Sequence, residues 1–299
     1  MYLLQFFNAI IPLITLPYVT RILGTSQYGI FSTSFNLVGY LQVVVDYGFS
    51  MSATREVALI GKNTKKIGKL FSAVFYSKAI LVFACCLFSI CYLEIWQPSK
   101  IQKLSYWMLM LTLIGIFLQV DWLFQGLQDM KYISIANILA RTITTILIFM
   151  GVKSYEDVLL YCFLYSLSPI ISNLIGIIIV KCKYKLKLCK VDFNQIKNEF
   201  KAGWYIFTTQ LTSKVFGSIG ITFLTFLATK STVGIFSAIQ KIPNILLLLW
   251  LPISQVLYPI VSKKMDNSFL EGKEFVLKVR KYMLAFFLIS NCFWICLFV

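Results

Sequence analysis

Four cationic side chains lie within stretches of the sequence that are otherwise apolar and long enough to cross a bilayer. They are Lys78, Arg141, Lys214 and Lys241. A charge at the centre of a bilayer costs about 2.5–3.5 kcal/mol on insertion scales, so water, a counter-ion or a ligand must offset it. Because lysine and arginine bind phosphate groups well, we expect the four to line a cavity for an anion such as phosphate or pyrophosphate. For any single lysine, the alternatives are snorkelling to an interface or pairing with a carboxylate.

Polar side chains accompany these cations at helical spacing. Asn137 precedes Arg141 by four residues, and residues three or four apart share one face of a helix. A polar face on an otherwise apolar helix is expected to turn away from lipid and toward the interior of a helix bundle. The polar residues that we expect to line the cavity are Gln5, Asn8, Asn137, Gln210, Ser237 and Asn244.

Acidic residues are scarce in the apolar stretches. Asp46 and Asp121 are the acids best placed to exchange a proton or a sodium ion during transport, and we treat them as candidate coupling residues. Pairing with a basic loop or capping a helix explains them equally well.

Several kinds of chemistry are excluded by what the sequence lacks. It contains no histidine, which removes Ser-His-Asp and Cys-His nucleophile systems, and no P-loop motif for ATP hydrolysis. Of the eight cysteines only Cys182 and Cys189 lie in a polar loop, and one such pair does not complete a zinc site. We therefore expect no enzymatic activity, no cofactor and no bound metal.

The elements that position these residues are predicted to be membrane-spanning helices. Hydrophobic residues make up 59% of the 299 residues and charged residues 13%, and the mean hydropathy is +0.79. This composition is typical of an all-α polytopic membrane protein rather than a soluble domain. Apolar stretches predict about nine helices, at 3–20, 28–48, 70–95, 104–125, 133–151, 157–180, 203–228, 234–261 and 281–299.

The distribution of basic residues predicts the orientation. If the N-terminus is cytoplasmic, the cytoplasmic segments hold 19 lysines and arginines and the outer segments hold five. This bias follows the positive-inside rule, so the net charge of +16 indicates orientation in a membrane and contact with membrane lipid rather than binding of nucleic acid.

An internal repeat is indicated by a short sequence that occurs twice. The run GIFS at 29–32 recurs at 234–237, an offset of 205 residues, and the same offset aligns Gln5 with Gln210. Chance similarity between two apolar sequences is the alternative. The repeat predicts a first six-helix lobe at 1–180, a basic cytoplasmic connector at 181–202 and a second lobe at 203–299. Because a full second lobe would need about three more helices, we expect the chain to be a truncated product or a fragment.

Local sequences resemble those of bacterial polysaccharide exporters, the Wzx-type flippases of lipid-linked oligosaccharides. The runs that carry the resemblance are LPYVTRILG at 16–24, DYGF at 46–49, DWLFQGLQDMKYI at 121–133 and VGIFSA at 233–238. The resemblance covers residues from about 8 to 264. It implies the two-lobe fold of the multidrug/oligosaccharidyl-lipid/polysaccharide exporter superfamily, here with an incomplete second lobe.

The resemblance also implies a function and partners. The substrate would be a polyprenyl-pyrophosphate-linked oligosaccharide repeat unit, of O-antigen, capsule or a related surface polysaccharide, turned across the bacterial cytoplasmic membrane by alternating access. Polysaccharide polymerase and export machinery would be partners. The four buried cations match an anionic pyrophosphate independently.

Three other readings stay open at this point. A peptidoglycan-precursor flippase would share the fold and the anionic headgroup. A multidrug exporter for cationic drugs would need acids in its cavity, where this sequence has lysines and an arginine. A membrane glycan polymerase or ligase would need a large outer loop, whereas the predicted outer loops are short.

Overall fold

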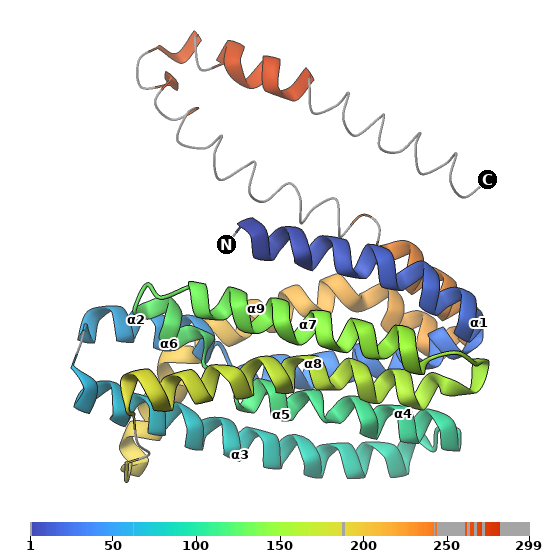
Figure 1. Ribbon diagram of the computed structural model, residues 1–299, viewed down its shortest axis with the longest axis horizontal. Helices are drawn as coiled ribbons and strands as arrows, with labels where there is room; N and C mark the ends of the chain where they lie inside the picture. The colour runs from blue at the N-terminus through green and yellow to red at the C-terminus, as the bar shows by residue number, and fades with distance from the viewer. Residues whose placement is uncertain are drawn as a thin grey trace. The chain divides into compact units, whose positions relative to one another are not determined.

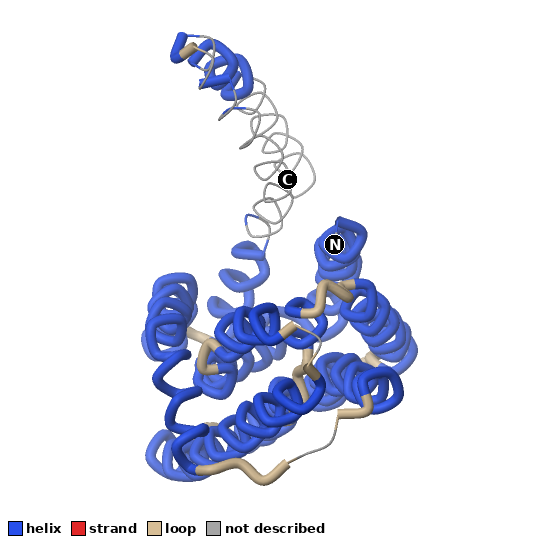
Figure 2. Tube along the Cα trace, turned by 90° about the vertical axis from the view of Figure 1, so that its left-hand side faces the viewer, coloured by secondary structure: helices blue, strands red, loops and turns tan. Residues whose placement is uncertain are grey.

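The computed structural model describes residues 2–61, 63–186 and 189–241, together with 243, 261, 264–265, 268–270 and 273–281; for 2–10 and 13 it describes the backbone only. The chain divides into two compact units, Met1–Ile242 and Pro243–Val299. All regular secondary structure in these described residues is helical (Figure 2). The second unit contributes a helix at 273–281, and the elements below belong to the first unit.

The helices of the first unit follow one another with short connections (Figure 1). In chain order they are α1 (Tyr2–Asp46), α2 (Phe49–Ile60), α3 (Thr64–Trp96), α4 (Lys100–Met110), α5 (Thr112–Phe117), α6 (Asp121–Gly126), α7 (Lys131–Gly151), the 3₁₀ turn η1 (Tyr155–Asp157), α8 (Val158–Ile179), the π turn η2 (Val180–Tyr184) and α9 (Phe193–Leu227). A further helix follows at 230–241.

The prediction of an all-α polytopic membrane protein is confirmed. Five helical segments in the described part of the chain are long and apolar enough to cross a membrane: Ile14–Ile60, Thr64–Trp96, Lys100–Gly126, Lys131–Gly151 and Tyr155–Tyr184. Large apolar side chains such as Phe83, Phe88 and Ile95 are exposed on the outer surface. In a membrane protein such side chains face lipid.

The first two predicted helices are the two arms of α1, which meet at a kink at Gly24 where the backbone is not helical. The backbone there has φ 70° and ψ 171°, a region that residues with a Cβ rarely adopt. The first arm of α1 is held by the Tyr18 hydroxyl, which donates to the carbonyls of Phe149 and Val152 at the end of α7. The second arm, 25–46, lies against α4, α8 and α9, and it organises the site described below.

The fourth predicted helix, 104–125, is wrong as a single helix. The structure divides it into α4, α5 and α6, with a non-helical break at 118–120. At this break the carbonyl of Ile116 accepts a hydrogen bond from the Lys78 ammonium, and the carbonyl of Gln119 accepts one from the Trp122 indole. The Ile116 carbonyl also accepts from the Gln119 amide, so side-chain donors supplement the backbone hydrogen bonds at this break.

Two helical segments extend beyond the predicted spans. α2 occupies 49–60, which the sequence suggested only as a basic loop, and α9 begins at 193, ten residues before the predicted start at 203. The N-terminus of α9 carries a capping box between Asp192 and Gln195. Most of the predicted helix at 234–261 and all but the first residue of the one at 281–299 lie outside the described residues.

The buried core consists of two clusters. One lies between the second arm of α1, α4 and α8, around the rings of Phe31 and Tyr161, whose centroids are 4.6 Å apart. The other lies among α2, α3 and α6, around Phe49 and Trp122. Gly126 makes α2 and α6 fit closely, because a Cβ at that glycine would lie 2.6 Å from the Val57 Cβ.

Candidate functional site

The second arm of α1 contacts three of the four predicted cations, each at a different level. Lys241 contacts Tyr28 near the start of this arm and Lys214 contacts Tyr40 in its middle. Lys78 contacts Asp46 at its end. The contacts run from Tyr28 to Asp46, a span of 18 residues or about 27 Å at 1.5 Å per residue. The structure therefore distributes these cations along one helix instead of gathering them at one depth.

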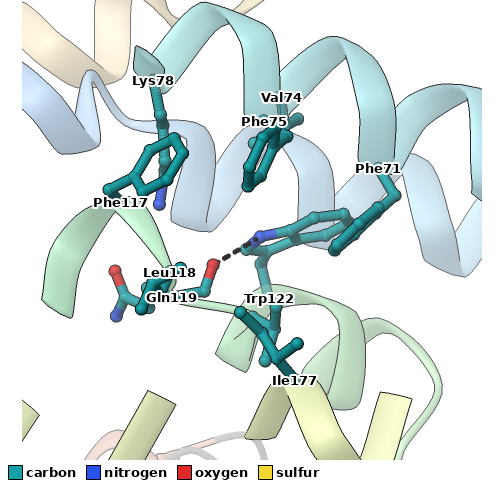
Figure 3. A pocket seen from close by; sticks show the side chains of 10 residues that line it. Phe71, Val74, Phe75, Lys78, Phe117, Leu118, Gln119, Trp122 and Ile177 are labelled. Atoms are coloured by element: carbon teal, nitrogen blue, oxygen red, sulfur yellow. Dashed lines mark hydrogen bonds between the residues drawn. The ribbon is translucent and has the colours of Figure 1, made fainter. Parts of the chain in front are cut away.

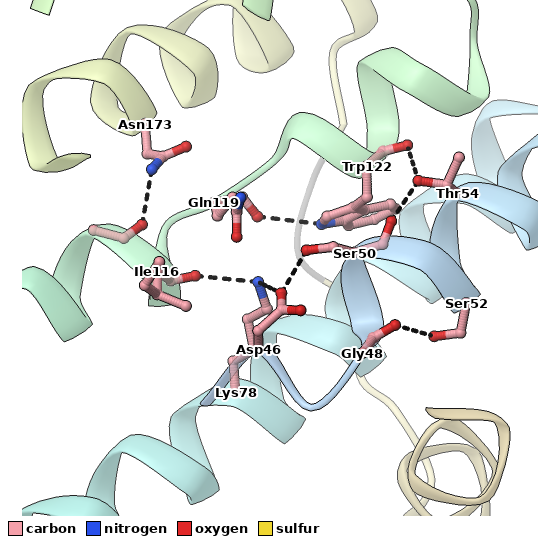
Figure 4. Close-up of polar contacts among 11 residues, drawn as sticks. Asp46, Gly48, Ser50, Ser52, Thr54, Lys78, Ile116, Gln119, Trp122 and Asn173 are labelled. Carbon is pink, nitrogen blue, oxygen red and sulfur yellow. Dashed lines mark hydrogen bonds and ion pairs between the residues drawn. The ribbon is translucent and has the colours of Figure 1, made fainter. Parts of the chain in front are cut away.

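The most deeply buried of these contacts is an ion pair between Lys78 and Asp46. The side chain of Lys78 is 1% exposed, and its Nζ lies 3.8 Å from Asp46 Oδ1 and 3.1 Å from the Ile116 carbonyl oxygen (Figure 4). Asp46 also accepts a hydrogen bond from the Ser50 hydroxyl. Asp121, the other candidate coupling acid, is the first residue of α6 and follows the break at 118–120. The ion pair joins one of the two candidate coupling acids, Asp46, to one of the predicted cations.

A small pocket adjoins the Lys78 side chain. Its volume is about 10 Å³, room for about one water molecule. Its lining comes from α3, the end of α5, the break at 118–120, the start of α6 and α8, and is mostly apolar and aromatic (Figure 3). The lining residues include Phe75, Phe117, Gln119 and Trp122. A pocket of this size does not admit a pyrophosphate or a sugar.

Lys214 and Lys241 make contacts of a different kind. Lys214 Nζ lies 3.4 Å from Asn36 Oδ1 and 5.4 Å from the centroid of the Tyr40 ring. Lys241 Nζ lies 5.4 Å from the centroid of the Tyr28 ring. An ammonium over an aromatic face gains cation–π stabilisation and keeps its positive charge. Among the described residues neither lysine forms an ion pair with a carboxylate.

Arg141 lies half-buried on α7, apart from the α1 contacts. Its guanidinium forms no ion pair within the described ranges. Asn137, one turn earlier, accepts a hydrogen bond from Ser172 of α8 and donates one to the Ile133 carbonyl, so its amide is engaged inside the protein. Gln210 is half-buried on α9. The side chains of Gln5, Asn8 and Asn244 lie outside the described residues.

A row of polar contacts joins the second arm of α1 to α9 and to the helix at 230–241. We call it the polar seam. Its five contacts are Thr25–Ser231 at 2.7 Å, Ser32–Ser237 at 2.8 Å, Thr33–Thr225 at 3.4 Å, Asn36–Thr222 at 2.9 Å and Tyr40–Thr222 at 2.8 Å. The predicted cavity residue Ser237 belongs to it, buried against Ser32. Lys214 lies beside the seam through Asn36.

The two copies of the predicted repeat contact each other in this seam. Ser32 and Ser237 occupy equivalent positions 205 residues apart, and their hydroxyls form a hydrogen bond. Gly29 and Gly234 are also equivalent, and a Cβ on Gly29 would lie 1.8 Å from the Lys230 carbonyl oxygen and 3.1 Å from the Gly234 nitrogen. These contacts therefore join residues that the predicted repeat would make equivalent.

We predict that cysteines at 32 and 237 will form a disulfide readily. The hydroxyls that they replace are 2.8 Å apart, which places the two Cβ atoms near bonding range. The measurement is cross-linking by mild oxidant in membranes, in a chain whose eight native cysteines have been replaced. The matched control pairs 237 with Ser34, a buried serine two residues along α1. If the 34/237 pair cross-linked as readily as the 32/237 pair, the close contact between positions 32 and 237 would be contradicted.

The sequence analysis missed an ion pair on the surface near η2. Asp129 accepts hydrogen bonds from the Lys183 ammonium, at 2.5 Å, and from the Tyr184 hydroxyl. These bonds hold the pKa of Asp129 below its usual range. Lys183 also lies 4.7 Å from the centroid of the Tyr132 ring. The contacts tie the loop after α6 to the start of the basic connector.

A buried acid near the start of α9 was also missed. Glu199 is 7% exposed, and its Oε2 has no hydrogen-bond partner in the described part of the chain. Burial, and then the nearby Glu56 carboxylate of α2, raise the pKa of Glu199 to about 7. The residue precedes the predicted span by one helical turn, and only its tertiary burial distinguishes it from an ordinary surface glutamate.

Comparison with known proteins identifies the family. Residues 1–265 match the family described as "Polysaccharide biosynthesis protein". The chain is 26% identical over 286 residues to a protein of Escherichia coli (strain K12) named "Putative O-antigen transporter", covering 96% of this chain and 68% of that protein. A protein of Shigella dysenteriae with the same name is 30% identical over 288 residues, covering 95% of this chain and 70% of that protein. No solved structure matches significantly. The chain therefore belongs to the polysaccharide biosynthesis protein family, a membrane transport family, as its resemblance to exporter flippases predicted.

Proposed function

We propose that this protein is a flippase for a polyprenyl-pyrophosphate-linked oligosaccharide repeat unit. Membership of the polysaccharide biosynthesis family along most of the chain carries the proposal, and the names of both relatives support it. The repeat unit would belong to O-antigen, capsule or a related surface polysaccharide. The protein would act in the bacterial cytoplasmic membrane with its N-terminus inside, the orientation that the distribution of basic residues favours.

The headgroup of such a lipid carries a pyrophosphate, and three cations are suited to contact it. Arg141, Lys214 and Lys241 form no ion pair with a carboxylate in the described part of the chain, so their charge remains available to an anion. Lys78 differs, because Asp46 already neutralises its ammonium and the adjoining pocket is too small for pyrophosphate. Three of the four predicted cations therefore remain as proposed contacts of the headgroup: Arg141, Lys214 and Lys241.

Translocation would proceed by alternating access between the two lobes of the repeat. The polar seam joins the second arm of α1 to the helices that begin the second copy, so opening a path to Lys214 or Lys241 would separate contacts of this seam. The half-buried Gln210 lies one turn before Lys214 on α9 and would contribute to the polar wall of that path.

The test is complementation in a host that lacks the gene. Deletion should accumulate lipid-linked oligosaccharide, measured by mass spectrometry, and remove surface glycan. The 299-residue chain should reverse both changes. The double variant Arg141→Ala, Lys214→Ala should lower the flipping rate on the order of 100-fold, because each lost charge-assisted hydrogen bond is worth about 1.5–3 kcal/mol.

The matched control removes two exposed charges, Lys100→Ala at the first residue of α4 with Lys153→Ala in the connection after α7, and should complement fully. Absence of any precursor accumulation after deletion would reject the flippase assignment. Full rescue by the Arg141→Ala, Lys214→Ala variant, at equal expression, would reject these two residues as headgroup contacts.

A further inference from the structure

The connector that leads from α8 to α9 is fastened at its start by an ion pair with a second donor. Lys183 and Tyr184, the last residues of η2, both donate hydrogen bonds to the Asp129 carboxylate. The side chain of Lys183 is 41% exposed and that of Asp129 is 30% exposed. An exposed ion pair alone holds a segment weakly, and the Tyr184 hydroxyl adds a charge-assisted hydrogen bond to it.

The backbone of Asp129 is itself held in place. Its amide donates to the Phe124 carbonyl at 2.8 Å, and its carbonyl accepts from the Tyr132 amide at 3.3 Å. Phe124 is 1% exposed and belongs to the core cluster among α2, α3 and α6. Asp129 and Tyr132 both lie in the run at 121–133 that carries the family resemblance. The carboxylate is therefore presented to the connector from a fixed position.

Two further contacts fasten the connector beyond η2. Lys185 has a φ of 50° and turns the chain, and Leu186 after it is 8% exposed and packs in the core cluster among α2, α3 and α6. The Cys189 amide donates to the Ser72 hydroxyl at 2.8 Å. Ser72 is fully buried on α3, and its hydroxyl donates in turn to the Gly68 carbonyl. We call the contacts made by Lys183, Tyr184, Leu186 and Cys189 the strap.

The strap ends just before α9 begins. Residues 190–192 have no regular secondary structure. The hydrogen bonds of Asp192 run forward, to Gln195 and Ile196 in the first turn of α9, so Asp192 is part of that helix end. Among the described residues, Lys190 and Val191 form no hydrogen bond. The backbone between the strap and α9 is therefore free to rotate at Lys190 and Val191.

This arrangement restricts how α9 can move against α1. The two helices meet where the Tyr47 ring stacks on Phe207, with centroids 4.6 Å apart, and again in the polar seam. A helix tethered at its start by two residues pivots about that point more readily than it slides along its own axis. Pivoting opens the seam and brings each hydroxyl back to the same partner. The strap therefore sets the register in which the seam closes again.

We propose that Asp129 is a positioning residue that fixes the connector to the helices before it, so that Lys190 and Val191 form the hinge about which α9 moves during transport. Asp129 acts through Lys183 and Tyr184. The role in transport rests on the proposed flippase function, whereas the fastening of the connector can be tested without transport.

Zero-length cross-linking tests the first fastening. A carbodiimide joins an ammonium to a carboxylate where the two are in contact, and it should form an amide between Lys183 and Asp129 in the purified 299-residue chain. Peptide mass spectrometry identifies the product. The exposed pair of Lys103 and Glu94, 3.5 Å apart, is the internal control. A cross-link between the control residues without one between Lys183 and Asp129 would overturn the proposal.

Limited digestion with trypsin tests whether the strap holds the backbone. Trypsin needs a free lysine side chain and several residues of extended backbone, so the native protein should resist cleavage after Lys183. Asp129→Ala should raise the rate of this cleavage about tenfold, and Tyr184→Phe, which removes one of the two donors, should raise it less. Glu94→Ala, which removes the acid of the exposed control pair, should leave it unchanged. An unchanged rate in Asp129→Ala would contradict the strap.

Hydrogen exchange of individual amides locates the hinge. The Cys189 amide is hydrogen-bonded to Ser72, whereas those of Lys190 and Val191 are not bonded within the described part of the chain. We expect the Cys189 amide to exchange at least about tenfold more slowly than the other two, after correction for intrinsic rates. Comparable rates at the three positions would place the hinge elsewhere.

Transport is measured separately, as flipping of lipid-linked oligosaccharide in proteoliposomes. Asp129→Ala should lower the maximal flipping rate at least about threefold and leave the half-saturating substrate concentration unchanged, while Glu94→Ala should match the wild type. A higher half-saturating concentration with an unchanged maximal rate would overturn the positioning role, because Asp129 would then contribute to substrate binding.

The cross-linked protein shows whether the strap stays closed during the cycle. Carbodiimide treatment should slow the wild type no more than it slows Asp129→Ala, in which the treatment can react only at other sites. Selective inactivation of the wild type would mean that the strap must open, and would overturn the hinge at Lys190 and Val191. If the wild type flips nothing while the cross-linking and exchange results hold, the proposed function fails and the fastening of the connector stands.

Discussion

Alanine at Gly29 or Gly234 should prevent the close crossing of the two repeat copies. A Cβ on Gly29 would lie 1.8 Å from the Lys230 carbonyl oxygen, and one on Gly234 would lie 2.0 Å from the Thr25 carbonyl oxygen. Both neighbours are backbone atoms, which cannot rotate away as a side chain can. Overpacking typically costs about 1–3 kcal/mol, and we expect these sites to reach or exceed the upper end of that range.

The measurement is thermal unfolding of the purified variants in detergent, together with complementation of the deletion host. Gly217→Ala is the matched control, because this glycine also lies within a helix and a Cβ there would meet nothing within 4 Å. Alanine should stabilise that position by up to about 1 kcal/mol, as expected for a helix interior. If Gly29→Ala and Gly217→Ala unfolded at the same temperature, the backbone at Gly29 would not lie in close contact with Lys230.

Replacing Lys78 by methionine should destabilise the protein strongly. Methionine fills much of the same space but leaves Asp46 without its counter-ion. Breaking a buried ion pair from one side typically costs about 3–5 kcal/mol. The double variant Lys78→Met, Asp46→Asn should recover most of this loss, because it removes the stranded charge. The comparison is by unfolding temperature and by yield of monodisperse protein.

The control for this series is the exposed pair of Lys103 and Glu94, which lie 3.5 Å apart with side chains 45% and 73% exposed. Exposed pairs contribute about 0–1 kcal/mol, so Lys103→Met should behave like the wild type. If Lys78→Met is no less stable than Lys103→Met, the Lys78 ammonium does not neutralise the Asp46 carboxylate. Failure of the double variant to recover stability would show that packing of the lysine stem dominates.

Some features could be predicted from sequence because their signal is local. A lysine inside an apolar stretch is conspicuous, which is why Lys78, Lys214 and Lys241 were found without a structure. α2 could have been predicted as well, since its buried residues Phe49, Ala53 and Val57 recur every four positions. Their signal was overlooked because the segment is short and carries charges.

Other features depend on contacts between distant residues. Nothing near Lys78 in the sequence indicates that its partner is Asp46, 32 positions earlier, and so the analysis grouped it with the headgroup cations. The break at 118–120 contains no proline, and the bonds that accompany it come from Lys78 and Trp122. The 205-residue offset between the two GIFS runs is visible in sequence, but it could not show that Ser32 and Ser237 form a hydrogen bond.

The polar seam has a consequence for the energy landscape of the protein. Its contacts are neutral hydrogen bonds between hydroxyl, phenol and amide groups, and such bonds between membrane helices average about 0.6 kcal/mol each. Five of them amount to about 3 kcal/mol, so the hydrogen bonds of the seam add only modestly to the free energy of separating the second arm of α1 from α9 and the helix at 230–241. Each hydroxyl can both donate and accept, so it re-pairs after a rotation of one bond. An interface of this kind holds two bodies in register while keeping their separation thermally accessible, on the microsecond-to-millisecond timescale of collective helix motions.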